Sequence, residues 1–272
     1  VVLKEFFLDR KTPYFEDYCR RLTDLPMLVR LRKDGDRFIP DRYVRQSDLA
    51  GEKKSRGKAP KSDRAAWKTV AVAEESGDLV VPQGSMGYRW PADGEPKGRW
   101  NLEEKDGETG TDVRLGLSLI DRRDDVLPVA FPYFGGMPHP HFVGNDQGGD
   151  VLQRNVPVRR VKLADGESYV ATVFDLLCAN YGLDRGLGGD CAKGFDDNVP
   201  YTPAWQEKIT GVSAAHAIEV ARGFAKNAEK TKGRSMVIIG AGMNHWYHQD
   251  MGYRSIINML MLCGTVGVSG GG

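Results

Sequence analysis

The last thirty-eight residues, 235 to 272, constrain the fold of this chain more than any other part. An apolar run, Ser235 to Ile239, leads into Gly240-Ala-Gly242 and a polar, aromatic loop, and an apolar segment then ends in Gly270-Gly-Gly272. This order predicts a buried strand, a glycine turn, a helix and a second glycine loop. Because glycine has no Cβ and tolerates positive φ, such bends let backbone amides approach the phosphates of a large ligand. The segment therefore predicts a nucleotide-type cofactor site.

The helix between the two glycine segments has clear start and stop signals. Asp250 is placed to cap it, and Gly264 follows its last apolar residue, where a left-handed C-cap belongs. Apolar residues recur between them at helical spacing: Tyr253, Ile256, Ile257, Leu260 and Met261. One face of this helix is therefore predicted to lie in the core, and ligand contacts fall to the loops at its ends.

A dinucleotide-binding Rossmann site is the first alternative for the glycine turn. That fingerprint needs a third glycine three residues after the second, where this chain has His245. A strand followed by two glycines is a weak signal, and a plain tight turn after a core strand is a second alternative. The aromatic loop His245-Trp246-Tyr247-His248 favours binding, because hydrogen-bonding aromatic side chains suit a flat heteroaromatic ligand. The alternative for the two histidines is that backbone hydrogen bonds simply hold them in a loop.

Motifs spread along the chain resemble those of a known family. One set is similar to the molybdopterin oxidoreductases, which bind a bis(molybdopterin guanine dinucleotide) cofactor: Tyr201-Thr-Pro-Ala-Trp205, Gly233-Arg-Ser235, Gly240-Ala-Gly242 and Gly267 to Gly272. A second set resembles one branch, the alpha (catalytic) subunits of membrane-bound respiratory nitrate reductases: Tyr18-Cys-Arg-Arg21, Thr23 to Val29, Trp100-Asn-Leu102, Phe131 to Gly136, Ala179 to Leu183 and Asn244 to His248.

The resemblance implies an α/β fold, namely part of the layered α/β cofactor-binding unit of the molybdopterin oxidoreductases with a β-rich insertion. The chain is then expected to be an internal piece of a longer subunit. Residues 1–31 form a helical lead-in and a first strand, 32–171 the β-rich insertion, and 172–272 the α/β cofactor-binding segment.

The resemblance also implies which residues contact the cofactor. They are Gly240, Gly242, Asn244, His245, Trp246, His248, Gly267, Ser269, Gly270 and Gly271. The histidines are expected to donate ring N–H groups to pterin or phosphate oxygens and so tune the cofactor's potential. No residue of this chain is expected to be catalytic or to ligate a metal. The four cysteines, at 19, 178, 191 and 263, are too far apart for a CxxC-type iron-sulfur or zinc site.

For the whole enzyme the resemblance implies reduction of nitrate to nitrite at a molybdenum bis(molybdopterin guanine dinucleotide) centre. Electrons from quinol would arrive through a heme-containing membrane gamma subunit, an iron-sulfur beta subunit and a 4Fe-4S cluster elsewhere in the parent chain. The resemblance also implies that the whole enzyme lies at the cytoplasmic face of the cell membrane. The segment alone is expected to be soluble, without cofactor and inactive. The alternatives are another oxyanion reductase, for perchlorate or selenate, or a non-catalytic module for subunit interaction.

Local patterns predict several further elements. Two hairpins are expected in the middle of the chain, Trp67 to Val72 with Leu79 to Val81, and Val156 to Leu163 with Ser168 to Thr172 across Asp165-Gly166. Helices are expected from a Thr172 cap to Gly182 and from Ser213 to about Ala228.

Charge and composition exclude some functions. Lys and Arg number 38 against 37 Asp and Glu, so no nucleic-acid partner is expected. The longest apolar stretch, Ile256 to Cys263, is far shorter than the roughly 20 residues that cross a bilayer. The basic run Lys53 to Lys61 is interpreted as a solvated loop, with a docking patch for another subunit as the alternative. His139-Pro-His141 is interpreted as surface rather than as a metal site.

Overall fold

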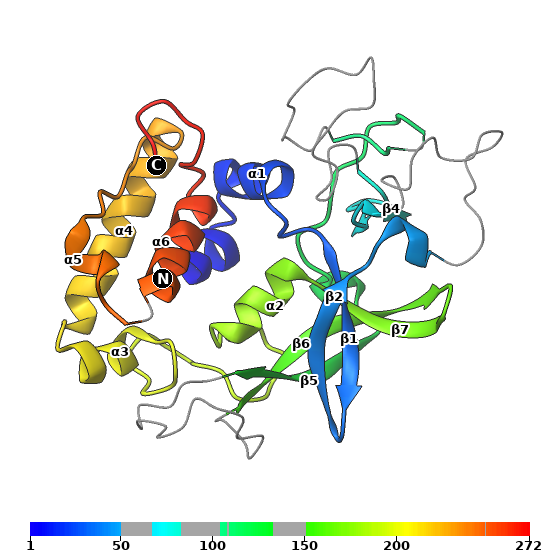
Figure 1. Cartoon of the computed structure of the whole chain (residues 1–272), viewed down its shortest axis with the longest axis horizontal. Helices are drawn as coiled ribbons and strands as arrows, with labels where there is room; N and C mark the ends of the chain where they lie inside the picture. Colours follow the sequence, from blue (N-terminus) through cyan, green and yellow to red (C-terminus); the bar gives the residue numbers. More distant parts are fainter. Residues whose placement is uncertain (50–66, 83–103, 108, 133–150, 248) are drawn as a thin grey trace. The chain divides into compact units, whose positions relative to one another are not determined.

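The computed structural model describes residues 1–49, 67–82, 104–107, 109–132, 151–247 and 249–272 (Figure 1). The chain divides into two compact units. Unit 1 comprises Val1–Cys19 and Pro203–Gly272, and unit 2 comprises Arg20–Thr202. The division at residues 31 and 171 that the sequence suggested stays a prediction. The basic run at 53–61, Trp100 to Leu102, His139-Pro-His141 and His248 lie outside the described residues.

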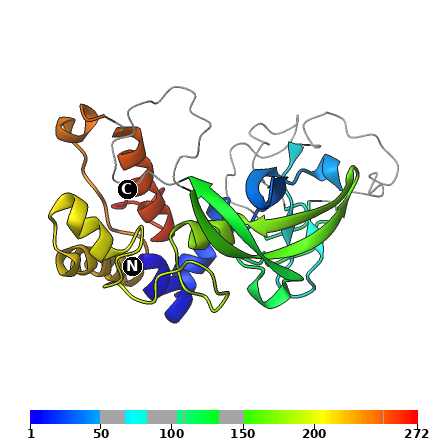
Figure 2. The ribbon, with the colours of Figure 1, turned by 90° about the horizontal axis from the view of Figure 1, so that it is seen from below.

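Unit 2 is built on a closed barrel with the strand order β1-β2-β5-β6-β7 (Figure 2). The strands are β1 (Leu28–Asp34), β2 (Arg37–Tyr43), β5 (Asp125–Pro132), β6 (Val151–Leu163) and β7 (Gly166–Thr172). Their pairings are antiparallel except between β2 and β5, which run parallel and meet through the pair Phe38 and Val129. A barrel of this kind satisfies the backbone groups of its edge strands by closure.

Both predicted hairpins are confirmed. β6 and β7 pair across Asp165-Gly166, where Gly166 has φ +125°, a conformation that favours glycine. The second hairpin pairs β3 (Ala71–Val72) with β4 (Leu79–Val80). Short 3-10 helices at Gln46–Asp48 and Ile120–Arg122 connect the strands.

Helix α2 (Val173–Asn180) follows β7 directly, as predicted from its cap. The Thr172 hydroxyl accepts a hydrogen bond from the Asp175 amide at 3.0 Å, and Gly182 ends the helix with φ +69°. Apolar side chains of α2 pack against the barrel core, which consists there of Val29, Leu31, Val129, Phe131, Val156, Val158 and Ala171.

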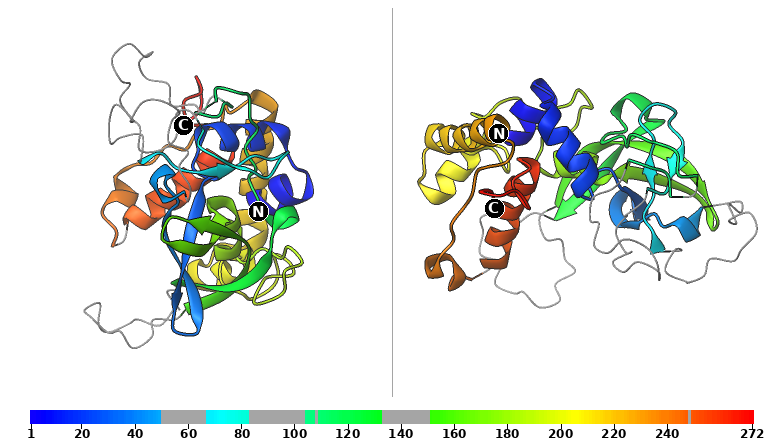
Figure 3. Two further views of the ribbon diagram at one scale, coloured as in Figure 1. Left: turned by 90° about the vertical axis from the view of Figure 1, so that its right-hand side faces the viewer. Right: turned by 90° about the horizontal axis from the view of Figure 1, so that it is seen from above.

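Unit 1 is helical and joins the two ends of the sequence (Figure 3). It contains a π-helix (Leu3–Asp9), α3 (Pro203–Thr210), α4 (Ala214–Thr231), α5 (Ala241–Asn244) and α6 (Gln249–Leu262). Helix α1 (Pro13–Leu22) begins in unit 1 and ends in unit 2. The Phe15 ring lies 5.6 and 6.1 Å from the rings of Phe6 and Phe7.

Three expectations for the end of the chain are wrong. Residues 235–239 form no strand, and Met236 and Ile238 are 54% and 89% exposed. The Gly240-Ala-Gly242 turn is instead the start of α5, and neither glycine has positive φ. Asp250 lies within the first turn of α6 rather than capping it. The strand fails because pairing needs a neighbouring strand. Within the described residues, the backbone of this segment makes only two hydrogen bonds, both with Gly272: the Val237 amide donates to the Gly272 carbonyl, and the Gly272 amide donates to the Ser235 carbonyl.

The chain is therefore a mixed α/β protein with a barrel-like sheet. Among its described residues, no helix has both the length and the apolar character needed to span a membrane.

Candidate functional site

The loop after α6 presents backbone amides to solvent. Gly264, Gly267 and Gly270 have φ of +64°, +80° and +83°, which places them in the left-handed region. Within the described part of the chain, the amides of Gly267, Ser269 and Gly270 donate to no acceptor, and all three residues are exposed. Backbone amides that lie in a glycine-containing turn without an acceptor can bind an anion. We call residues 264–271 the C-terminal glycine loop.

Two kinds of glycine make up this loop. A Cβ at Gly267 would meet no atom within 4 Å, so this residue leaves open space for a ligand. A Cβ at Gly271 would collide with the carbonyl oxygens of Gly233 and Thr265. Gly271 is therefore required by packing within unit 1, because the loop backbone lies directly on the backbone after α4.

Two tyrosines of α1 donate hydrogen bonds to backbone carbonyls of the C-terminal glycine loop. The Tyr14 hydroxyl donates to the Gly264 carbonyl at 2.7 Å, and the Tyr18 hydroxyl donates to the Val266 carbonyl at 2.8 Å. Tyr18 is only 7% exposed, and its burial raises the pKa of its phenol to about 12. Both hydroxyls therefore keep their protons, and remain donors, at neutral pH.

A basic side chain lies beside the loop. The aliphatic stem of Arg234 would touch a Cβ at Gly270 at 3.9 to 4.0 Å, and Arg234 itself is exposed. An arginine next to free backbone amides is a suitable combination for binding phosphate, because both donate hydrogen bonds and the guanidinium adds charge. The arrangement can hold a phosphate-bearing ligand.

The predicted aromatic loop lies at the end of α5. Asn244 is the last residue of that helix, and the His245 amide caps it by donating to the Met243 carbonyl. The side chains of Trp246 and Tyr247 are 74% and 76% exposed. In the described residues, no hydrogen bond joins this loop to the C-terminal glycine loop.

The structure leaves most of the predicted cofactor contacts exposed and gives Gly271 a packing role. The exposed ones are Gly240, Gly242, Asn244, His245, Trp246, Gly267, Ser269 and Gly270. Contact of any of these residues with a cofactor stays a prediction. Sequence reasoning missed Tyr14, Tyr18 and Arg234. The polar i and i+4 pair on α1 was a signal for the tyrosines, but nothing local indicated what they contact.

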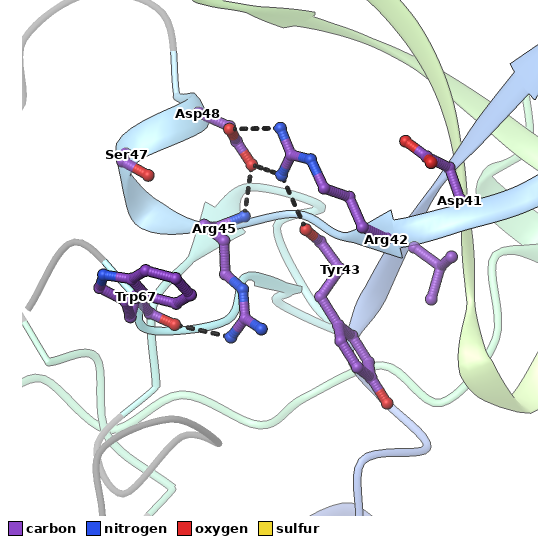
Figure 4. A pocket seen from close by; sticks show the side chains of 8 residues that line it. Asp41, Arg42, Tyr43, Arg45, Ser47, Asp48 and Trp67 are labelled. Atoms are coloured by element: carbon purple, nitrogen blue, oxygen red, sulfur yellow. Dashed lines mark hydrogen bonds and ion pairs between the residues drawn. The ribbon is translucent and has the colours of Figure 1, made fainter. Parts of the chain in front are cut away.

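Unit 2 has a cavity of its own, of about 660 Å³, at the end of β2 (Figure 4). Arg42 and Asp48 form a bidentate ion pair in its wall at 2.6 and 2.9 Å. The Arg45 guanidinium lies 5.5 and 5.8 Å from the rings of Tyr43 and Trp67, and it donates to the Trp67 carbonyl at 2.7 Å. The charges of this wall are largely matched by one another, so the cavity is a weaker candidate than the C-terminal glycine loop.

Metal ligation has no candidate in the described ranges, where no group of three or more His, Cys, Asp or Glu side chains is arranged around a common point. Cys19, Cys178 and Cys263 are buried, and burial raises the pKa of the Cys178 and Cys263 thiols to about 12.

Comparison with known proteins relates the whole chain to one group. No family model matches the chain. It is 50% identical to the respiratory nitrate reductase 1 alpha chain of Escherichia coli (strain K12), with 100% of this chain and 21% of the relative covered. It is 39% identical to the nitrate reductase alpha chain of Bacillus subtilis (strain 168), again over 100% of this chain and 20% of the relative. Perchlorate reductase subunit alpha of Dechloromonas aromatica (strain RCB) is 33% identical over 59% of this chain and 16% of its own length. The chain spans about a fifth of the length of the nitrate reductase chains that it matches.

Proposed function

We propose, from the premise that this chain is homologous over its whole length to a segment of nitrate reductase alpha chains, that it is a cofactor-binding segment of a nitrate-reducing catalytic subunit. The observation that carries the proposal is the extent of the match, which covers 100% of the chain and therefore both units. The perchlorate reductase match covers a smaller part of the chain at lower identity, which favours nitrate over perchlorate as the substrate.

The cofactor proposed for the parent subunit is molybdenum bis(molybdopterin guanine dinucleotide), which supplies two-electron reduction of nitrate when bound. The free amides of Gly267, Ser269 and Gly270, with Arg234 beside them, fit its phosphates. The exposure of Trp246 and His245 supports their proposed roles, in which Trp246 stacks on a flat ring of the cofactor and His245 donates an N–H to it. Gly240, Gly242, Asn244, His248 and Gly271 remain proposed contacts of the same ligand.

We propose that another part of the parent chain covers segment 235–239. Its apolar side chains Met236 and Ile238 are 54% and 89% exposed, as is typical of a surface that packs against a further layer. The 4Fe-4S cluster would likewise be held outside this segment. Beta and gamma subunits, with iron-sulfur clusters and heme, and a position at the cytoplasmic face of the membrane complete the proposal. The name alpha chain, borne by the relatives, supports a multi-subunit assembly.

The proposal is tested at Arg234 in the full-length subunit. Replacing Arg234→Gln removes the charge beside the loop, so we expect molybdenum and guanine nucleotide per subunit to fall about tenfold at limiting cofactor, since a hydrogen bond to a charged group contributes roughly 1.5 to 3 kcal/mol. Lys230→Gln, at an exposed position in the last turn of α4, is the matched control. Equal cofactor content in both variants and the wild type would remove the loop from the cofactor site.

The alternative, a module for subunit interaction without a cofactor role, makes a different prediction. In that case the full-length subunit keeps its cofactor when Arg234 is changed, but loses its partner subunits. For the chain by itself, we expect elemental analysis to find no stoichiometric molybdenum and viologen assays to find no nitrate-dependent turnover. Stoichiometric molybdenum or nitrate-dependent turnover in the isolated chain would contradict its assignment as one segment of a larger site.

A further inference from the structure

The hydroxyl of Tyr18 controls one particular peptide plane of the C-terminal glycine loop. It donates to the Val266 carbonyl at 2.8 Å, from a side chain that is almost completely buried. The same peptide unit carries the amide of Gly267. No peptide bond of the described chain is cis, and in a trans peptide the C=O and the following N–H point in opposite directions. Tyr18 therefore turns the Gly267 N–H away from α1.

No described atom blocks the space into which the Gly267 amide points. Gly267 is exposed, a Cβ there would meet nothing within 4 Å, and its N–H has no acceptor among the described residues. Glycine at φ +80° can rotate its peptide planes more freely than any other residue, so without an anchor the N–H would sample many directions. The tyrosine hydrogen bond removes that freedom before a ligand arrives.

We propose that Tyr18 is a positioning residue that aims the Gly267 amide at a phosphate oxygen of the bound cofactor. Tyr14 anchors the start of the same loop by holding the Gly264 carbonyl at 2.7 Å. The inference rests on the proposed function of the loop, and it adds to that function a preorganising contact from α1, about 250 residues away in sequence.

The substitution Tyr18→Phe tests the contribution of the hydroxyl group alone. The Tyr18 ring packs on Gly264, where a Cβ would lie 3.0 Å from the Tyr18 Cγ, and Phe keeps that packing. Tyr18→Phe therefore deletes one hydrogen bond and leaves the ring in place. Tyr253→Phe is the matched control, because Tyr253 lies in α6 of the same unit and its hydroxyl makes no hydrogen bond to a described residue.

The experiment titrates the chain with inorganic pyrophosphate and follows the amide resonance of Gly267 by NMR. We expect a saturable shift in the wild type and in Tyr253→Phe, and an affinity about 3- to 10-fold weaker in Tyr18→Phe, the range that one neutral hydrogen bond supports. Thermal unfolding of each variant establishes that it is folded. In the full-length subunit, we expect Tyr18→Phe to lower retained guanine nucleotide at limiting cofactor, and added cofactor to restore it.

The possible outcomes distinguish the role of Tyr18 from the role of the loop as a phosphate site. Wild-type affinity in Tyr18→Phe, with a saturable shift in all three proteins, would overturn the role of Tyr18 and leave the loop as a phosphate site. If the Gly267 resonance of the wild type shows no saturable shift with pyrophosphate, the positioning role of Tyr18 is also overturned. The Arg234 result in the full-length subunit would then decide whether the loop contacts the cofactor at all.

Discussion

At the scale of single residues, the most unusual side chain is Arg154. It lies in β6 with its side chain 2% exposed, and none of its guanidinium nitrogens forms a hydrogen bond with the described residues. Asp190 lies 3.7 Å from Nε, and burial lowers the pKa of the guanidinium. The guanidinium rests on Gly182, just after the last turn of α2, where the negative end of the helix dipole favours a cation. Two features therefore favour glycine at position 182, the positive φ and the contact with the Arg154 guanidinium.

Comparing two glycine substitutions separates these reasons. Gly182→Ala would place a methyl group on the Arg154 guanidinium, whereas Gly35→Ala, at a similar φ of +64°, would meet no atom within 4 Å. We expect Gly35→Ala to lower the free energy of unfolding by about 1 kcal/mol through backbone strain alone. Gly182→Ala should cost at least about 2 kcal/mol more, because a buried cation must move. Urea unfolding of both variants measures the difference, and equal losses would show that Arg154 adjusts without cost.

At the scale of elements, a buried polar cluster fixes the junction between β7 and α2. The fully buried Asp175 carboxylate accepts from the Thr172 and Ser118 hydroxyls, the Leu119 amide and Arg185 Nη1, at 2.6 to 2.9 Å. Arg185 also donates to Ser118 at 2.7 Å. Every oxygen of this carboxylate is satisfied, so the start of α2 is tied to the segment before β5 and to the loop after α2.

Removing the charge of Asp175 should cost far more than removing that of an exposed partner. We expect Asp175→Asn to lower the free energy of unfolding by roughly 3 to 5 kcal/mol, because it leaves buried Arg185 without its counter-ion. Asp165→Asn breaks the ion pair between Arg30 and the Asp165 carboxylate, which is 60% exposed, so we expect a much smaller loss, because solvent screens an exposed ion pair. Denaturant unfolding monitored by circular dichroism provides both values. Similar values would mean that the buried cluster does not stabilise the junction.

Elements whose cause is local were predictable from the sequence, and those that depend on distant partners were not. The Asp165-Gly166 hairpin and the Thr172 cap follow from a few adjacent residues, and both are confirmed. The strand expected at 235–239 is wrong because apolar residues cannot form a strand without a neighbour to pair with. Barrel closure relies on the single β2–β5 pair, which leaves no pattern in either strand. For the same reason, the glycine loop was found from its composition, whereas the tyrosines that hold it were not.

At the scale of the whole molecule, unit 1 leaves many apolar side chains exposed. Those that are at least half exposed are Ile209, Val220, Met236, Ile238, Trp246, Tyr247, Met251 and Ile257. Scattered apolar residues are normal on a surface, but this number within one unit is typical of a surface that another part of a protein covers.

A single substitution tests this interpretation in two contexts. Ile238 is 89% exposed, so we expect Ile238→Ser to change the free energy of unfolding of this chain by less than about 0.5 kcal/mol. In the full-length subunit, where we propose that the segment is covered, the same change should cost about 1 to 3 kcal/mol and lower the melting temperature by several degrees. The chain serves as the control for the subunit. No change in either context would mean that Ile238 stays in solvent in both.

The hydrogen bond between Tyr18 and Val266 also has a consequence for biosynthesis. Its partners are 248 residues apart, and at about 5 to 20 residues per second a ribosome makes Val266 roughly 12 to 50 s after Tyr18. Unit 2, which lies between them as one uninterrupted stretch, has that interval in which to fold. Residues 1–19, with their three clustered phenylalanines, have no partner from the later part of unit 1 during that interval.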